Sequence, residues 1–224
     1  MWDFRVPFVG ETDDARFPLG PKEAPRRRVF STAPGKYLME TIWISAAMVA
    51  VAEIGDKTQL LAIVLAAKFR KPVPIVLGIL AATILNHAAA ASLGYFVAEW
   101  LQGRMFQIGV GIAFIAMAGW ALIPDKEDED AGQRSQGGVF LTTLIAFFLV
   151  EIGDKTQIAT TLLAARFHEI ALVTVGTTLG MMAANVPAVM LGEAATRIVP
   201  LHYVRIAAAC IFALIGVWIV VSAL

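Results

Sequence analysis

Four carboxylates lie in two identical copies of a seven-residue motif, and each copy interrupts a long apolar stretch. The first copy (EIGDKTQ) runs from Glu53 to Gln59, and the second runs from Glu151 to Gln157. A charged side chain in the middle of a membrane helix costs about 2.5–3.5 kcal/mol on the mildest scale, and such residues are typical of ion or proton sites. The motifs therefore predict an ion-binding site inside a bilayer.

Each motif supplies oxygen ligands of one chemical kind. At 100° per residue, its first, fourth and seventh residues fall within about 120° of one helix face, whereas the threonine at the sixth position points away. Carboxylate and amide oxygens suit hard divalent cations such as Mn²⁺, Ca²⁺ and Mg²⁺, and the sequence has no cluster of Cys or helix-spaced His that would favour Zn²⁺ or Cu⁺. The predicted metal ligands are Glu53, Asp56, Gln59, Glu151, Asp154 and Gln157.

Salt bridges within each motif are the structural alternative to a metal site. Glu53 and Lys57 are spaced i,i+4, and the second copy repeats this spacing, so each lysine could neutralise the glutamate of its own motif. This pairing accounts for the two glutamates but gives no role to Asp56 and Asp154. The sequence therefore favours a functional ion site over a purely structural one.

Further polar residues accompany the motifs. Asn86 and His87 lie in the apolar stretch that follows the first copy, and Asn185 aligns with His87 in the second half of the chain. Inside a membrane such residues either face a site or form hydrogen bonds between helices, and the sequence leaves both roles open. The supporting candidates are Lys57, Thr58, Lys155, Thr156, Asn86, His87 and Asn185.

The composition is that of a polytopic membrane protein. Of the 224 residues, 58% are hydrophobic and 16% are charged, whereas soluble domains have about 25% charged residues. The 18 basic and 18 acidic residues balance, so nothing indicates a nucleic-acid partner, and the lipid bilayer is the expected environment. Six apolar stretches can cross a hydrocarbon core of about 30 Å as helices. These predicted spans are residues 38–67, 73–98, 105–123, 138–165, 170–195 and 203–223.

The two halves of the chain repeat at an offset of 98 residues. This offset aligns the two motifs, and it also pairs Gly78 with Gly176 and Trp120 with Trp218. Such an offset indicates a duplication. Each copy contains three spans, an odd number, so the second copy enters the membrane from the opposite side. The predicted fold is an all-α integral membrane protein with six transmembrane helices in two inverted three-helix repeats, and its site lies at the repeat interface near the midplane.

Composition also predicts the boundaries of the repeats. The proline-rich start of the chain is typical of a disordered tail, because it lacks an apolar stretch. The distribution of Lys and Arg favours a cytoplasmic central linker with both termini on the other side. The predicted segments are the tail at residues 1–36, the first repeat at 37–123, an acidic linker at 124–137 and the second repeat at 138–224.

The doubled motif resembles that of a known family. Glu-x-Gly-Asp-Lys/Arg-Thr/Ser on the first span of each repeat is similar to the motif of the Golgi-type Mn²⁺/Ca²⁺ cation exchangers, which include bacterial manganese exporters and chloroplast members. The resemblance covers residues 38–224. It implies a secondary transporter, not an enzyme, that exports Mn²⁺ or Ca²⁺ in exchange for H⁺ and holds no permanent cofactor. The residues that match the family's acidic positions are Glu53, Asp56, Glu151 and Asp154.

The compact length is more similar to the bacterial members of that family. The resemblance therefore implies a multi-pass protein of a bacterial inner membrane, and it leaves a homo-oligomer open. Charge balance supports proton exchange, because the four motif carboxylates and two motif lysines sum to a charge that one divalent cation or two protons would neutralise. Metal and protons are therefore expected to compete for the same oxygens.

Other functions use the same residues differently. A passive divalent cation channel or an assembly factor that transports nothing would need no proton coupling. An intramembrane aspartyl protease would use two membrane aspartates that share a proton. However, Asp56 and Asp154 belong to equivalent copies, each with an adjacent lysine and an upstream glutamate, which a catalytic pair does not need. The sequence therefore favours the exchanger.

Overall fold

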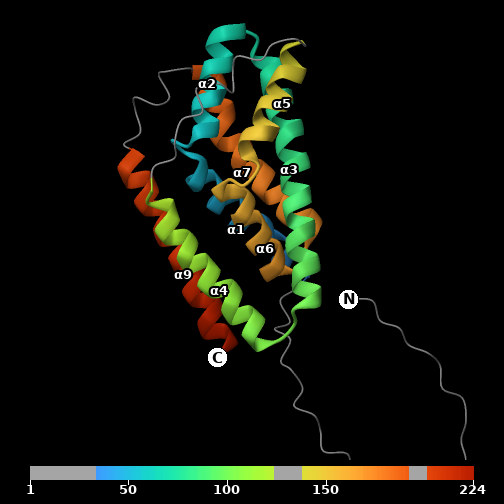
Figure 1. Cartoon of the computed structure of the whole chain (residues 1–224), viewed down its shortest axis with the longest axis vertical. Helices are drawn as coiled ribbons and strands as arrows, with labels where there is room; N and C mark the ends of the chain where they lie inside the picture. Colours follow the sequence, from blue (N-terminus) through green and yellow to red (C-terminus); the bar gives the residue numbers. More distant parts are fainter. Residues whose placement is uncertain (1–33, 124–137, 192–200) are drawn as a thin grey trace, which may run out of the picture. The chain divides into compact units, whose positions relative to one another are not determined.

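The structure is a computed structural model that describes residues 34–123, 138–191 and 201–224. These residues form helices, without a strand among them, and the helices belong to one compact unit. The all-helical prediction is therefore confirmed for this part of the chain. The helices are α1 (Pro34–Glu53), α2 (Lys57–Phe69), α3 (Pro72–Trp100), α4 (Arg104–Ala121), α5 (Val139–Glu151), α6 (Lys155–Phe167), α7 (Ile170–Leu191) and α9 (Leu201–Ala223) (Figure 1).

Two predicted segments fall mostly outside the described residues. The predicted linker at 124–137 lies outside them completely. The predicted tail at 1–36 also lies outside them except for its last three residues, which belong to α1 because that helix begins at Pro34. Proline suits the first turn of a helix, since its missing N–H would have no helical partner there.

Four helices are long and apolar enough to cross a membrane, namely α3, α4, α7 and residues 202–223 of α9. The pair α1 and α2 passes the same test as one span bent by 69°. Helix α5 is apolar but has only 13 residues, fewer than the roughly 20 that a span needs. The described residues thus contain four or five candidate spans. The fourth predicted span, 138–165, differs because α6 carries several polar side chains after its break from α5.

Both motifs interrupt the helix in which they were predicted to lie. Helix α1 ends at Glu53 and α2 begins at Lys57, with Gly55 at φ 78° between them. Helix α5 ends and α6 begins at the equivalent positions, with Gly153 at φ 76°. Glycine adopts this left-handed conformation without steric cost. The prediction of a continuous helical face through each motif is therefore wrong, because residues on opposite sides of the turn do not follow one helical period.

Helices α1 and α6 lie side by side and run antiparallel. Tyr37, near the start of α1, donates a hydrogen bond to the carbonyl oxygen of Phe167 at the end of α6 over 2.5 Å. At the other end of the pair, Glu53 of α1 lies close to Asp154 at the start of α6. Helix α2 packs against α5. Figure 1 shows α2 and α5 towards one end of the helical unit and α1 and α6 towards the other.

The contacts that join the two halves also repeat at the 98-residue offset. A Cβ added to Gly176 of α7 would lie 2.6 Å from the backbone oxygen of Ile42 in α1. A Cβ added to Gly78 of α3 would lie 2.9 Å from the backbone oxygen of Phe140 in α5. Only glycine permits helices to approach this closely, as is common between membrane helices. The same helix contact is therefore made twice, with the two halves exchanging roles.

The apolar core consists of two clusters. One joins α4, α6 and α9 and includes Phe114, Leu163 and Phe212. The other joins α2, α3 and α5 and includes Leu65 and Phe147. Helices α2 and α6 directly follow the two motif turns. The two clusters pack each of them against helices of both halves.

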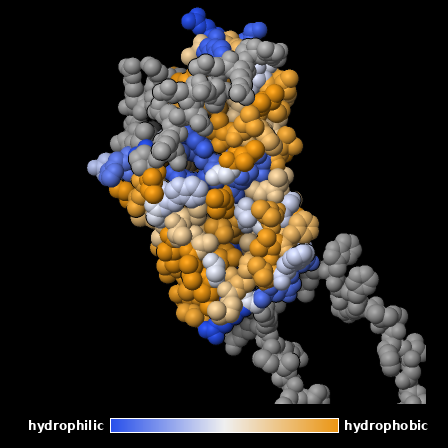
Figure 2. All heavy atoms as spheres, in the orientation of Figure 1, coloured by the Kyte–Doolittle hydropathy of each residue, from blue (hydrophilic) through white to orange (hydrophobic). Residues whose placement is uncertain are grey.

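Large apolar side chains also cover much of the outer surface. Figure 2 shows apolar residues over most of one face, with hydrophilic residues near the ends and in a band partway along it. An exposed apolar surface of this extent marks a membrane or protein contact, and its position on the spanning helices suits lipid. Examples of these exposed residues are Val73, Leu77, Leu93 and Phe96 of α3 and Leu214, Val217 and Val221 of α9.

Candidate metal site

The breaks place an aspartate at the start of each second helix. Asp56 is the N-cap of α2 and Asp154 is the N-cap of α6, both with extended backbones. The backbone N–H of Asp56 donates to the carbonyl oxygen of Glu53, and that of Asp154 donates to the carbonyl oxygen of Glu151, each over 3.0 Å. A helix N-terminus carries a partial positive charge, which favours a carboxylate. Each turn therefore holds a glutamate and an aspartate close together.

The motif glutamines close these turns. The amide oxygen of Gln59 accepts a hydrogen bond from the backbone N–H of Gly55 over 2.8 Å, and that of Gln157 accepts one from Gly153 over 2.7 Å. The amide nitrogen of Gln59 also donates to the carbonyl oxygen of Ala184 in α7 over 3.1 Å. In this structure both amide oxygens that were predicted as ligands bond the backbone of their own turn.

Three of the four predicted carboxylates come together. One oxygen from each of Glu53, Asp56 and Asp154 lies within 4.8 Å of the other two. Two oxygens that bind one Ca²⁺ ion from opposite sides are about 4.6–5.2 Å apart, so this spacing suits a single divalent cation. All three residues are buried, and they come from the end of α1 and the starts of α2 and α6. We call these three residues the carboxylate group.

Within the carboxylate group, Glu53 has one bonded and one open oxygen. Its Oε2 accepts a hydrogen bond from the hydroxyl of Thr58. Its Oε1 is buried and has no hydrogen-bond partner among the described residues. The sequence predicted that Thr58 points away from this face, but the turn at Gly55 brings the hydroxyl back to Glu53. A buried polar oxygen without a partner is costly, which is consistent with an oxygen that binds a cation.

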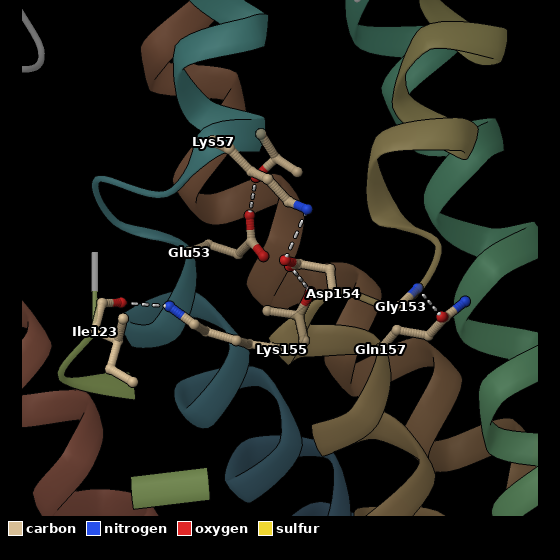
Figure 3. Close-up of polar contacts among 9 residues, drawn as sticks. Glu53, Lys57, Ile123, Gly153, Asp154, Lys155 and Gln157 are labelled. Carbon is tan, nitrogen blue, oxygen red and sulfur yellow. Dashed lines mark hydrogen bonds and ion pairs between the residues drawn. The ribbon is translucent and has the colours of Figure 1, made fainter. Parts of the chain in front are cut away.

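The two motif lysines point in different directions, Lys57 towards Asp154 of the carboxylate group and Lys155 away from it towards Ile123 (Figure 3). The ammonium of Lys57 lies 3.2 Å from a carboxylate oxygen of Asp154, so this ion pair joins the first motif to the second. Lys155 donates to the carbonyl oxygen of Ile123, after the end of α4, over 2.8 Å. The hydroxyl of Thr156 donates to the other oxygen of Asp154 over 3.1 Å. Lys57 and Thr156 thus position Asp154.

The fourth predicted carboxylate, Glu151, has a different environment. The amide nitrogen of Asn86 donates to its Oε2 over 2.7 Å, and the hydroxyl of Thr83 donates to its Oε1 over 3.3 Å. Asn86 also donates to the carbonyl oxygen of Phe148 over 3.1 Å. Sequence reasoning found Asn86 but missed Thr83. The spacing of these two residues, i and i+3 on one helix, is the signal that could have indicated a shared face.

The other two supporting candidates make no hydrogen bond to a motif carboxylate within the described residues. His87 is fully buried on α3, and neither of its ring nitrogens has a hydrogen-bond partner in this part of the chain. Asn185 donates to the carbonyl oxygen and to the sulfur of Met181, one turn earlier on α7, over 3.1 and 3.0 Å. Asn185 therefore bonds within its own helix.

A cavity reaches the first motif from α4 and α9. Its lining includes Gly55 and Asp56 of the turn, Lys155 of α6, and Arg205 and Phe212 of α9. Arg205 is half-buried, and sequence reasoning did not assign it to the site. A charged residue within an apolar span is a signal of function, and the same rule that singled out the motifs could have found it.

Comparison with known proteins gives independent information on function. The sequence profile described as "Divalent cation/proton antiporter GDT1" matches residues 41–129 and 139–224. A protein of Vibrio cholerae serotype O1 named "Putative manganese exporter" is 45% identical over 189 residues, which cover 84% of this chain and 94% of that protein. "GDT1-like protein 3" of Oryza sativa is 29% identical over 174 residues, which cover 65% of this chain and 61% of the rice protein. No solved structure matches the chain significantly.

The profile match includes both motifs and the helices that follow each of them. The family consists of transporters and not of enzymes, so the two motif aspartates are not a protease dyad. Its description agrees with the exposed apolar helices, which are those of a multi-pass membrane protein. The chain belongs to the GDT1 family of divalent cation/proton antiporters.

Proposed function

We propose that this protein exports divalent cations, chiefly Mn²⁺, in exchange for protons, and that the cation binds at the carboxylate group. The observation that carries the proposal is the meeting of Glu53, Asp56 and Asp154 from both motifs within 4.8 Å. Buried carboxylates in a membrane protein are costly and mark ion pathways. Carboxylate oxygens suit both Mn²⁺ and Ca²⁺ and do not separate the two ions. The name of the Vibrio relative supports Mn²⁺.

Charge explains how the same site would exchange metal for protons. The carboxylate group and Lys57, which pairs with Asp154, carry together a charge of about −2 when all four side chains are ionised. One divalent cation or two protons would neutralise this charge. A buried site that keeps its charge is unfavourable, so metal and protons compete for the same oxygens and the release of one favours the binding of the other.

We propose further that the helices form six spans in two inverted repeats, residues 37–123 and 138–224, with α1–α2 and α5–α6 as two broken spans. The antiparallel course of α1 and α6 supports this arrangement. The paired glycine contacts, Gly176 with Ile42 and Gly78 with Phe140, support it as well. Broken helices at a repeat interface provide ion sites near the membrane midplane in many secondary transporters. The distribution of Lys and Arg supports a cytoplasmic linker, and the similarity to the Vibrio cholerae protein supports a bacterial inner membrane.

Transport by purified protein in liposomes tests the exchange. Mn²⁺ uptake is measured with and without an imposed pH gradient, and we expect the gradient to drive Mn²⁺ against its own concentration gradient. Asp56→Asn keeps the shape of the side chain but removes its charge, so it should abolish uptake. Glu99→Gln, which removes an exposed carboxylate near the end of α3, is the matched control and should retain uptake.

Two results would contradict the proposal. Uptake that is indifferent to the pH gradient in the unmutated protein would identify a passive channel. Undiminished uptake by both Asp56→Asn and Asp154→Asn would show that the cation binds elsewhere.

A further inference from the structure

The two motifs are identical in sequence, but their glutamates have different surroundings. Glu53 accepts a hydrogen bond at one oxygen, from Thr58 of its own motif, and its other oxygen has no partner among the described residues. Glu151 accepts hydrogen bonds at both oxygens, from Asn86 and Thr83 of α3. The motif therefore cannot be the source of the difference.

The source is the helix that faces each glutamate. At the 98-residue offset, Asn86 corresponds to Ala184 and Thr83 corresponds to Met181. The side chains of alanine and methionine have no hydrogen-bond donor. Helix α3 therefore supplies two donors that α7 cannot supply at the equivalent positions. This difference lies outside both motifs, in residues that the duplication did not keep alike.

We propose that Asn86 and Thr83 are positioning residues that assign different tasks to the duplicated glutamates, so that Glu53 binds the divalent cation with Asp56 and Asp154 while α3 holds Glu151 outside this coordination group. The inference rests on the proposed function, because it concerns the same carboxylates. Its basis is geometric. Glu53 is within 4.8 Å of both aspartates, whereas Glu151 is not part of that group of described residues.

The hydrogen bonds explain why the cation prefers Glu53. A carboxylate must give up its hydrogen bonds from protein donors before those lone pairs bind a metal ion. Either oxygen of Glu151 would bind a cation in competition with a donor of α3, Asn86 at 2.7 Å or Thr83 at 3.3 Å, whereas Oε1 of Glu53 has no partner among the described residues. Asn86 would keep its bond to the carbonyl oxygen of Phe148 but would lose a charged acceptor inside the protein, which adds a cost. The assignment thus depends on donors from α3 and not on the acids themselves.

The alternative is that Asn86 is an ordinary hydrogen bond between membrane helices. It does join α3 to α5 through Phe148, so its loss would reduce stability in either case. Yield and thermal stability therefore cannot separate the two roles. The readout must show which glutamate binds the cation, since a purely structural role would not change this.

Mn²⁺ binding to the purified full chain in detergent supplies that readout. Free Mn²⁺ gives an electron paramagnetic resonance signal that weakens on binding, so titration with Mn²⁺ alone yields an affinity. We expect Glu53→Gln to weaken binding by at least about 10- to 100-fold, since the loss of a group that only positions a metal ligand already costs this much. Glu151→Gln should change the affinity by no more than about threefold, as for a residue outside the coordination group. Equal losses in the two variants would overturn the inference.

Exchange of the donors between the two halves is the sharper test. The variant with Thr83→Met, Asn86→Ala, Met181→Thr and Ala184→Asn moves the donors from α3 to α7. In this background we expect the order to reverse, so that Glu151→Gln weakens Mn²⁺ binding by about tenfold or more and Glu53→Gln by much less. An unchanged order in the folded protein would refute the positioning role.

If the fourfold variant does not fold, the single substitution Asn86→Ala is tested in its place. It frees one oxygen of Glu151, so the loss caused by Glu53→Gln should become smaller in this background than in the unmutated protein, whereas an unchanged loss would contradict the inference. Asn86→Gln, which keeps the donor, should restore the original difference. The failure of the proposed function looks different, because Asp56→Asn would then bind Mn²⁺ as tightly as the unmutated protein does.

Discussion

At the scale of single residues, Thr58 carries a contact that helical periodicity could not predict. Its hydroxyl donates to Glu53 across the turn at Gly55, although the two residues would lie on different faces of a continuous helix. The bond orients Glu53, whose other oxygen has no partner among the described residues. Under the proposed function, Thr58 would act on the cation through Glu53, in the way that residues behind a metal ligand usually do.

Replacement of Thr58 tests this contact. Thr58→Val keeps the shape but removes the donor, so Glu53 loses its orientation and Mn²⁺ affinity should fall by about tenfold. Thr58→Ser keeps the hydroxyl and is the matched control, with an affinity close to that of the unmutated protein. Mn²⁺ titration of the purified protein measures both. Equal affinities of the valine and serine variants would show that the hydroxyl is not needed.

The residues of the site were predictable to different degrees. The carboxylates could be found from the sequence, since charge within an apolar stretch identifies them without a structure. Thr83 and the ion pair of Lys57 with Asp154 could not, because both depend on which helices of the two halves meet. Distances along the chain carry no information on such contacts until the packing is known.

At the scale of helices, the break in each motif was the main error of the sequence interpretation. The signals were present, because aspartate is a favoured N-cap residue and glycine is the residue for positive φ. Gly55 precedes Asp56 directly, as Gly153 precedes Asp154. The apolar residues on both sides of each motif favoured the prediction of one continuous helix. Hydropathy identifies a span but does not show whether its helix continues through it.

Close packing of α3 against α6 depends on a glycine outside the motifs. A Cβ added to Gly94 would lie 2.0 Å from the backbone oxygen of Thr161, closer than atoms approach. Gly94→Ala should therefore force the helices apart and lower the free energy of unfolding by about 1–3 kcal/mol, the usual cost of overpacking. Thermal unfolding in detergent measures the change.

Gly119 of α4 provides the matched control for this prediction. A Cβ at Gly119 would have no neighbour within 4 Å, and alanine favours a helix over glycine by up to about 1 kcal/mol. Gly119→Ala should therefore leave stability unchanged or raise it. If Gly94→Ala were as stable as Gly119→Ala, the close contact of α3 with α6 would be wrong.

At the scale of the whole molecule, the duplication predicts the sidedness of the loops. Helix α3 has 29 residues and is about 43 Å long at 1.5 Å per residue, so its two ends lie on opposite sides of a membrane. Single cysteines at Lys71 and at Gln102, in a Cys210→Ala background, should react with an impermeant thiol reagent from opposite sides. A cysteine at Gln133, outside the described residues, should react from the same side as Lys71.

Each result of the labelling has a distinct meaning. Reaction of the Gln102 and Gln133 positions from one side would contradict the inverted repeats. The Cys210→Ala background is needed because Cys210 is exposed on α9. Cys210→Ala protein without an introduced cysteine, treated with the same reagent, is the control for reaction at other groups. The sequence predicts this arrangement from the odd number of spans in each half, without any knowledge of how the helices pack.

The positions of the two helix breaks also determine how the membrane potential acts on cation binding. Helix α1 has 20 residues before the first turn and α2 has 13 after it, so in the proposed arrangement a cation at the carboxylate group would have crossed part of the membrane potential from either side. One elementary charge that crosses the full potential gains about 2.3 kcal/mol per 100 mV. A divalent cation at half depth gains about the same energy, which changes its dissociation constant about 40-fold per 100 mV. Voltage therefore acts on the binding step, even if a complete cycle exchanges one divalent cation for two protons and moves no net charge.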